Sequence, residues 1–406
     1  MYSKYVYKSK IKIMIKLVKD TIDDEDIANL IKWLSQKPAP RLTMGPKTRE
    51  FEEKWSKWIG SKYSVFVNSG SSANLLMLYA LKVMGNLRNN KVVVPALAWA
   101  TDMAPVIQLG FDPLIVDCNM NNLAVDVSQL EAIFRHHKPA AMILVSVLGL
   151  SPDMDKIVEL CKTYGVELLE DNCESQGTEF DGVRLGNFGL MSSFSTYFGH
   201  TMSTIEGGMV CTNDKDVYDL LVMLRSHGWD RDLDSATQQR LRTKWGVDEF
   251  SALYTFYEPG FNLRSTDLQA VIGIKQLDKV DDMIDTRNEN FYYFLDAIKS
   301  YDKKKKIWKP TEHKDSFTAS FCYPMIFQSK KDKEKAVAAL IEADVECRPL
   351  ICGSMGTQPF FIKRYGRHET LNAKTVDDCG IYVPNHPKMG KKEIEFICKT
   401  VTDAIK

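Results

Sequence analysis

From residue 63 onward, short apolar runs alternate with longer segments in which apolar residues recur every three or four positions. Continuous apolar runs rich in β-branched residues are typical of strands buried on both faces, whereas the longer segments are typical of helices that cover a sheet. The expected strands are 63–68, 92–96, 113–118, 141–147, 166–172 and 208–212, and the expected helices are 71–84, 100–110, 127–137 and 154–165. The alternation predicts an α/β fold in which helices flank a large mixed sheet.

Two amphipathic helices are expected ahead of this alternation, at residues 21–35 and 47–59. The first begins with capping and acidic residues, which favour a helix N-terminus. Its expected apolar face consists of Ile27, Leu30, Ile31 and Leu34. Lysines recur through residues 1–20, so this stretch is expected to form a basic strand or arm.

The second half of the chain predicts a separate, smaller unit. Residues 229–260 are charged, aromatic and weakly periodic, which indicates an insertion or lid, and residues 262–300 predict one or two long helices. Beyond them, extended segments at 321–328 and 345–350 and a helix at 331–343 indicate an α+β domain. We therefore expect two domains: a large one at 1–285, including the N-terminal arm, and a small one at 286–406.

Composition narrows the class of protein. The chain has 406 residues, 44% of them apolar, and 53 basic residues balance 53 acidic ones, so neither nucleic acid nor a membrane surface is expected as the main partner. No run approaches the length of a membrane span, and the N-terminus lacks the apolar core of a secretory signal, so a cytoplasmic location is expected. The nine cysteines form no CxxC pair, which favours buried thiols over a metal site.

The junction between the first strand and its following helix is built of small polar residues, including Gly70, Ser71 and Ser72. A helix N-terminus presents unpaired backbone N–H groups, and the two hydroxyls add further donors, so this junction is suited to a phosphate monoester. It lacks the GK[ST] sequence of a Walker loop. An ordinary capped helix is the alternative interpretation.

Candidate chemistry also follows other strands. Asp171 ends an apolar strand, and a buried carboxylate there implies a cationic partner such as a protonated ring nitrogen. Glu174 follows three residues later, and Trp99, after another strand end, is suited to stacking on a planar ring, with core packing as its alternative. Because ligands of such sheets bind at the carboxyl ends of the strands, these side chains are expected to share a pocket.

Residues 192–209 form a stretch rich in glycine and hydroxyl groups, with His200 at its centre. Hydroxyls able to hold a phosphate are supplied by Ser193, Ser195, Thr201, Ser203 and Thr204. In combination with the helix N-terminus, Asp171 and Trp99, this stretch indicates a pocket for pyridoxal phosphate.

Segments 67–78, 170–177, 194–210, 260–273 and 382–387 resemble the sugar-nucleotide aminotransferase family, in family order and over nearly the whole chain. The resemblance implies the fold type I architecture of pyridoxal-phosphate-dependent transferases. That family has a lysine, which binds the cofactor covalently, where this chain has His200. The histidine, and Glu174 where the family usually has glutamine, resemble the subgroup that 3-dehydrates GDP-4-keto-6-deoxy-D-mannose.

The resemblance also implies roles for the matching residues. Asp171 would pair with the pyridinium nitrogen, Trp99 would stack on the ring, and Glu174 would lie near the phenolic oxygen or the active amine. The phosphate ligands would be Gly70, Ser71, Ser195 and, from a neighbouring subunit, Asn262. The active site would then be shared within a homodimer.

The reaction implied is loss of the C3 hydroxyl from a nucleotide-linked 4-keto-6-deoxy sugar, with L-glutamate as the amino donor that yields pyridoxamine phosphate. His200 would act as the base, because imidazole forms no stable imine but is a competent general base near neutral pH. Contact of His227 and Arg264 with sugar or glutamate is weighed evenly against structural roles. The candidates for the diphosphate are Arg225, Arg231, Arg240 and Arg242.

Three alternatives stay open at this point. A nucleotide-sugar 4-aminotransferase, or a lysine-to-histidine variant of one, would share most of these motifs. Related dehydratases with an iron–sulfur cluster also carry histidine at this position, although the scattered cysteines give no close cluster spacing. A regulatory relative without catalysis would bind no cofactor.

Overall fold

The computed structural model describes residues 14–311, 313–314 and 316–406, so most of the expected basic arm lies outside the described residues. The helices are α1 (Asp24–Leu34), α2 (Pro46–Ile59), α3 (Gly70–Met84), α4 (Ala100–Gln108), α5 (Val127–His137), α6 (Met154–Tyr164), α7 (Lys215–Arg225), α8 (Ser235–Trp245), α9 (Asp267–Leu277), α10 (Val280–Tyr301), α11 (Lys330–Glu342), α12 (Pro359–Tyr365), α13 (Leu371–Cys379) and α14 (Lys391–Ala404). The strands are β1 (Tyr63–Val67), β2 (Lys91–Pro95), β3 (Asp112–Val116), β4 (Ala141–Val145), β5 (Glu167–Asp171), β6 (Glu179–Phe180), β7 (Val183–Arg184), β8 (Met191–Ser195), β9 (Gly208–Thr212), β10 (Ser316–Phe317), β11 (Cys322–Ile326), β12 (Arg348–Pro349) and β13 (Gly380–Pro384).

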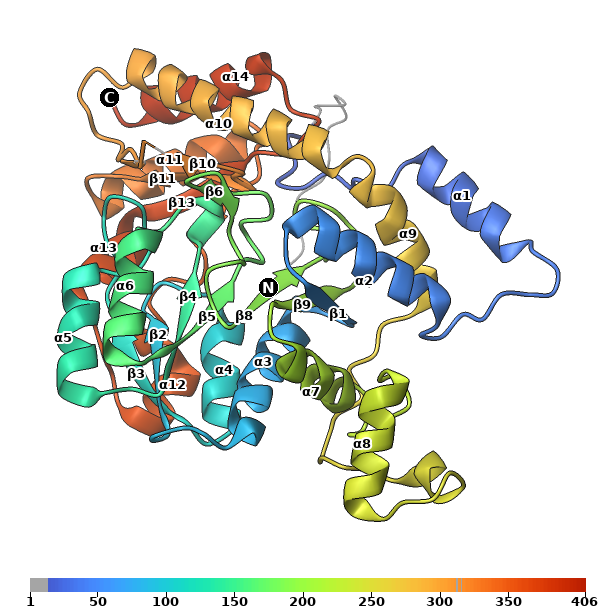
Figure 1. Ribbon diagram of the computed structural model, residues 1–406. Helices are drawn as coiled ribbons and strands as arrows, with labels where there is room; N and C mark the ends of the chain where they lie inside the picture. Colours follow the sequence, from blue (N-terminus) through green and yellow to red (C-terminus); the bar gives the residue numbers. More distant parts are fainter. Residues whose placement is uncertain (1–13, 312, 315) are drawn as a thin grey trace.

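A seven-stranded mixed sheet forms the centre of the large unit, in the order β1-β9-β8-β5-β4-β2-β3. β9 runs antiparallel to both of its neighbours, and the strands from β8 to β3 are parallel. Helices cover both faces, as Figure 1 shows. The alternation of side chains explains this: Val65 and Val67 pack in the cluster that includes α3, whereas Phe66 packs with α2 on the opposite face. The predicted α/β fold is confirmed.

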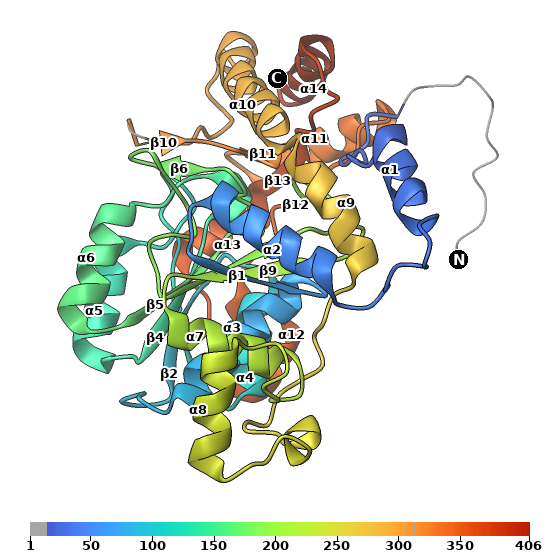
Figure 2. The same cartoon turned by 45° about the vertical axis from the view of Figure 1, so that its right-hand side comes forward.

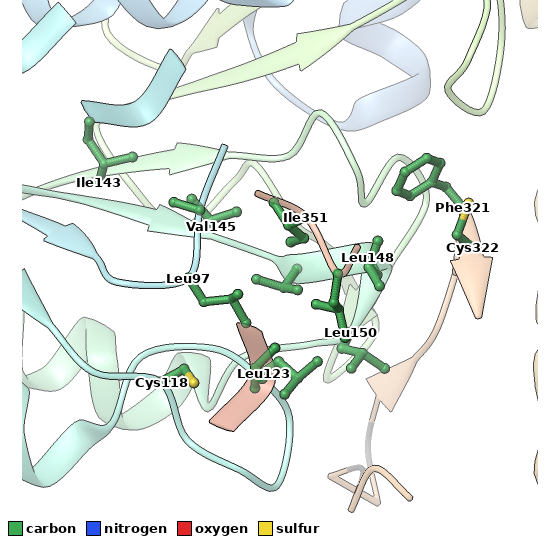
Figure 3. Packing of buried hydrophobic residues seen from close by; sticks show 14 of the residues in the cluster. Leu97, Cys118, Leu123, Ile143, Val145, Leu148, Leu150, Phe321, Cys322 and Ile351 are labelled. Carbon is green, nitrogen blue, oxygen red and sulfur yellow. The ribbon is translucent and has the colours of Figure 1, made fainter. Parts of the chain in front are cut away.

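A smaller antiparallel sheet, β11-β13-β12, forms the second unit, with α10, α11 and α14 packed around it (Figure 2). One buried apolar cluster extends from the large sheet to this unit. Figure 3 shows Leu148 and Leu150, which follow β4, in the same cluster as Phe321 and Cys322 at the start of β11. The two sheets therefore share a core. The domain boundary expected at residue 286 falls within α10 and stays a prediction.

Two details differ from the sequence-based expectations. Part of the hydroxyl-rich stretch is a buried strand, β8, because neighbours satisfy its serines: Ser192 donates to the carbonyl of Gly186, and Ser193 to Asn74. The predicted helix α1 is present, but much of its apolar face is exposed in the single chain. The exposed members of that face are Ile27, Ile31 and Leu34.

Candidate active site

A cavity of about 570 Å³ lies at the carboxyl ends of the parallel strands. It brings together seven residues that the sequence singled out: Gly70, Ser71, Trp99, Asp171, Glu174, Ser195 and His200. The small unit closes one side with Phe321, Arg348 and Tyr382, and residues Leu17 and Val18 of the N-terminal segment add to the wall. The volume is that of a pocket for a cofactor or small substrate.

One end of the cavity is the N-terminus of α3. Ser69 caps this helix by accepting a hydrogen bond from the backbone N–H of Ser72 at 3.0 Å, and Gly70 and Ser71 form its first turn beside Ser195. Backbone N–H groups in a first turn have no partner within the helix, so they favour an anion. Gly208 of β9 passes so close that an added Cβ would lie 2.3 Å from the carbonyl oxygen of Ser69. The strand thus fixes the position of this helix end.

Asp171, the last residue of β5, supplies a buried carboxylate to the cavity. Its Oδ2 accepts a hydrogen bond from the side chain of Asn74 at 2.5 Å, and its Oδ1 accepts one from the backbone N–H of Cys173 at 2.8 Å. Both donors are neutral, and within the described ranges no cationic side chain forms an ion pair with Asp171. The site therefore presents an uncompensated negative charge to a ligand.

Trp99 precedes the first turn of α4, and 51% of its surface is exposed. A tryptophan that served core packing would be buried, so this exposure argues against that alternative, and the stacking role stays a prediction.

His200 lies in the loop between β8 and β9, and its ring is 5.5 Å from that of Phe321. The loop is held by two backbone contacts: the His200 N–H donates to the carbonyl of Tyr197 at 2.9 Å, and its carbonyl accepts from Arg287 at 3.2 Å. Burial lowers the pKa of the imidazole to about 4, and the Arg287 charge acts in the same direction, while Asp171 opposes it. His200 is consequently neutral near pH 7 and able to accept a proton.

Glu174 accepts a hydrogen bond from the backbone N–H of Leu148 at 2.8 Å. Burial raises the pKa of its carboxyl group to about 7, and the nearby charge of Asp171 adds to this, although the Leu148 hydrogen bond opposes it. Glu174 can therefore hold or release a proton near neutral pH. Two titratable groups with pKa values displaced in opposite directions line one cavity, which is a pattern typical of acid–base chemistry.

Three predicted site residues lie outside this cavity. Asn262 is exposed and accepts a hydrogen bond from Arg264 at 3.0 Å. The Arg264 guanidinium lies 5.6 Å from the centre of the Trp229 ring, and the ring of His227 lies 5.2 Å from the same tryptophan. Asn262 is thus the exposed member of a cluster whose other members, His227, Trp229 and Arg264, are half-buried. The cluster flanks the segment that carries α8, which Figure 1 shows protruding from the large unit.

The arginines proposed for a diphosphate do not line the cavity either. Arg225, one of the four candidates, is buried in an ion pair with Glu52 and is therefore not free to bind a diphosphate. Arg242 pairs with Asp230 at 2.8 Å, and Arg240 lies 3.9 Å from Asp216. Arg231 packs over Trp229 and Tyr254.

The hydroxyl groups of the loop also proved less available than expected, because most of them are used internally. Ser193 donates to Asn74, Thr204 bonds with Thr196 at 2.5 Å, and Ser203 accepts from the backbone N–H of Ile205. Thr201 is buried away from the cavity lining. Of the five hydroxyl residues proposed for the phosphate, Ser195 lines the cavity.

Sequence reasoning missed further site residues, namely Asn74, Asp102, Arg348 and Tyr382. Asn74 and Asp102 are polar residues on the buried faces of helices. A polar residue at an otherwise apolar helical position is the sequence signal that could have identified them. Arg348 and Tyr382 come from the small unit, and no local pattern connects them to the strand ends.

Over the described residues, no group of three or more histidine, cysteine or acidic side chains could hold a metal ion. None of the helices there combines the length and apolar character that a membrane crossing requires. The cytoplasmic location stays a prediction.

Residues 20–402 match the model of the DegT/DnrJ/EryC1/StrS aminotransferase family. The chain belongs to this family. It is 32% identical over 385 residues to a GDP-4-keto-6-deoxy-D-mannose 3-dehydratase of Yersinia pseudotuberculosis, a match that covers 93% of this chain and 95% of the relative. It is 33% identical over 392 residues to the enzyme of the same name from Escherichia coli O55:H7, which covers 94% and 97%.

Members of the family with known structure share the fold. A crystal structure of GDP-4-keto-6-deoxymannose-3-dehydratase with a trapped PLP-glutamate geminal diamine has a TM-score of 0.86 and 31% identity, covering 95% of this chain and 100% of that one. The expected fold type I architecture is thus confirmed, as is the family resemblance.

Proposed function

We propose that this protein is a pyridoxal-phosphate-dependent 3-dehydratase that acts on a nucleotide-linked 4-keto-6-deoxy sugar, GDP-4-keto-6-deoxy-D-mannose, with L-glutamate as the amino donor. The observation that carries the proposal is His200, a neutral imidazole in a cavity whose described lining contains no lysine. The relatives that match nearly the whole chain under the dehydratase name support it.

The residues present fit pyridoxal phosphate. The first turn of α3, with Ser71 and Ser195, would hold the phosphate, and the half-exposed indole of Trp99 would stack on the ring. Asp171, whose protein partners are neutral donors, would pair with the protonated ring nitrogen. A charged carboxylate, an anion site and an aromatic face thus match the three recognisable parts of the cofactor.

When bound, the cofactor supplies an electron sink and, in its pyridoxamine form, the amine that reacts with the C4 ketone. The chain's own residues would move the protons. His200 has one enclosed ring nitrogen, Nδ1, without a hydrogen-bond partner in the described structure, which leaves Nε2 for the cavity. Nε2 would take a proton from the C4′ carbon and return it to the departing C3 hydroxyl. Glu174, poised near neutral pH, would act beside it as a second proton-holding group.

We also propose that the protein works as a homodimer in which Asn262 completes the phosphate site of the partner subunit. Two features support this. Asn262 is exposed and outside its own chain's cavity, and the apolar side chains Ile27, Ile31 and Leu34 of α1 are uncovered in the single chain. An isologous interface would cover such a face in both copies.

The test is incubation of the purified protein with GDP-4-keto-6-deoxy-D-mannose, pyridoxal phosphate and L-glutamate. Ammonia and 2-oxoglutarate should both appear, together with the 3,6-dideoxy-4-keto sugar nucleotide, and the His200→Asn variant should form none of that sugar. A 4-amino sugar without ammonia would instead identify an aminotransferase. Iron and sulfide analysis of the same preparation separates this enzyme from the iron–sulfur dehydratases.

The role of His200 has a separate test in His200→Lys. This variant should capture pyridoxal phosphate covalently, as fixation by borohydride would reveal, and should lose dehydration. Undiminished dehydration by the lysine variant would overturn the role assigned to His200.

A further inference from the structure

A second carboxyl group, that of Asp102, lines the same cavity as Asp171. Asp102 lies in the first turn of α4 and is fully buried. Its Oδ2 accepts a hydrogen bond from the backbone N–H of Trp99 at 3.0 Å, which accounts for one of its two oxygens. A capping role of this kind is ordinary for an acidic residue in a first turn. It does not account for the other oxygen.

That other oxygen points to Asn74. The Asn74 side-chain nitrogen lies 3.3 Å from Oδ1 of Asp102 and 2.5 Å from Oδ2 of Asp171, while its oxygen accepts a hydrogen bond from Ser193 at 2.5 Å. One neutral amide therefore serves two buried carboxyl groups. Two like charges in this arrangement would repel each other without a cation to offset them, so the pair is expected to keep one proton.

The surroundings assign the proton to Asp102. Asp171 accepts hydrogen bonds from Asn74 at 2.5 Å and from the backbone of Cys173 at 2.8 Å, whereas Asp102 has the longer contacts, 3.0 Å from Trp99 and 3.3 Å from Asn74. Asp102 is therefore the less well solvated of the two carboxyl groups as an anion. Burial raises the pKa of Asp102 well above its ordinary value. The charge of Asp171 and a side-chain hydrogen bond between the two carboxyl groups raise it further, as does the charge of Glu174, whereas the Trp99 hydrogen bond lowers it.

Other groups near the pair do not change this assignment. Burial raises the pKa of the thiols of Cys173 and Cys352, so these remain neutral, and the cation of Arg348, which lines the cavity, is paired with Glu346 at 3.0 Å.

We propose that Asp102 keeps its proton at neutral pH and donates it in a hydrogen bond to Asp171, as the positioning residue for the carboxylate that meets the cofactor ring. The pair then carries one negative charge, located on Asp171. The hydrogen bond orients that carboxylate and limits its basicity, so that the ring nitrogen meets a single, dispersed charge. The consequence for the cofactor rests on the proposed function, whereas the protonation of Asp102 does not.

Infrared difference spectroscopy of the cofactor-free protein at pH 7 tests the protonation directly. The wild-type minus Asp102→Asn spectrum should contain the C=O stretch of a protonated carboxylic acid. The matched control is Asp26→Asn, since Asp26 is also a buried first-turn capping aspartate but pairs with Lys279 at 3.0 Å. Its difference spectrum should lack that band. Absence of the band in the Asp102 spectrum would overturn the proposal, whatever the enzyme's reaction.

Titration of bound pyridoxal phosphate by absorbance tests the effect on Asp171. Asp102→Asn retains a donor toward Asp171, so the pH of the ring-nitrogen transition should stay in place. Asp102→Leu lacks the donor and should move the transition to higher pH by about one unit, because the charge of Asp171 becomes less dispersed. A shift of the transition to lower pH in both variants would mean that Asp102 is ionised. No shift in either variant would mean that Asp102 acts only as a helix cap. Each of these two outcomes overturns the proposal. Failure of the wild-type protein to bind the cofactor would instead contradict the proposed function.

Discussion

Arg287, a residue that is only 2% exposed, donates a hydrogen bond from Nη2 to the backbone carbonyl of His200 over 3.2 Å. The same side chain donates to the carbonyls of Phe321 and Asn385. No acidic side chain forms an ion pair with it in the part of the chain that the structure describes. A buried cation thus connects the His200 loop to the small unit through backbone carbonyls alone.

Replacing Arg287 should change the pH at which His200 loses activity. Burial is the main reason for the low pKa of His200, and the Arg287 charge adds to it. In Arg287→Met the imidazole is easier to protonate, so the acid limb of kcat should move to higher pH by about one unit. Because three carbonyls lose a donor, the free energy of unfolding should also fall by about 3 kcal/mol.

Arg287→Lys is the matched control. It keeps the charge while losing the fork of donors, so it should destabilise the fold with little movement of the acid limb. Superimposable pH profiles for wild type and Arg287→Met would contradict the electrostatic role.

Stability should depend on pH through Glu174 and His200 in opposite directions. The pKa of Glu174 rises from 4.5 to about 7 in the folded protein, so the folded state holds an extra proton in that window and stability falls as pH rises through it. The pKa of His200 falls from 6.5 to about 4, so the unfolded state holds the extra proton and stability increases as pH rises from about 4 to 6.5. Each effect is about 3 kcal/mol at its full extent.

Between pH 4.5 and 6.5 these two contributions should nearly cancel. The free energy of unfolding of the cofactor-free protein can be measured by chemical denaturation at both pH values. Relative to wild type, it should increase with pH in Glu174→Gln and decrease with pH in His200→Asn. The double variant should resemble wild type in its pH dependence. If the pH dependence of unfolding changed in the same direction in both single variants, the opposite pKa shifts of Glu174 and His200 would be wrong.

Gly208→Ala should weaken cofactor binding without any change in the lining residues. A Cβ there would lie 2.3 Å from the carbonyl oxygen of Ser69 and 2.6 Å from the backbone nitrogen of Gly70, so the start of α3 must shift. We expect the dissociation constant for pyridoxal phosphate, measured by absorbance titration, to rise at least about tenfold. Gly390→Ala serves as control, since its nearest contact would be a glutamate side chain at 3.2 Å. Equal affinities in both variants would mean that the helix end does not bind the phosphate.

The shared active site predicts complementation between inactive variants. His200→Asn and Asn262→Ala should each have little activity as homodimers. After denaturation and joint refolding, a mixed dimer contains one intact site, so activity should return to about a quarter of the wild-type value. Activity equal to the sum of the separate variants would contradict a contribution of Asn262 to the partner's site.

The sequence predicted the large sheet well, because its strands are buried on both faces and therefore apolar throughout. Asp171, Trp99 and Ser195 could be assigned to one pocket because strand ends meet at one edge of a sheet. Strand β8 escaped detection since its serines are polar in sequence and become compatible with burial only through distant partners such as Asn74.

Other parts of the site depend on contacts that no local pattern contains. Glu52 lies 173 positions from Arg225, and their ion pair removes that arginine from the diphosphate candidates. Asp102 and Asp171 come together only once α4 and β5 are packed, and Arg287 reaches His200 from a helix 87 positions away.

The cavity wall combines side chains of both sheets, with Asp171 from the large sheet and Phe321 and Tyr382 from the small unit. A molecule bound there would contact both, so its binding energy would stabilise each unit against local opening. Hydrogen exchange can test this. Amides of β5 and β13 that exchange independently in the empty protein should slow together and exchange at a common rate once the cavity is filled. The bound molecule would then make the two sheets a single cooperative unit.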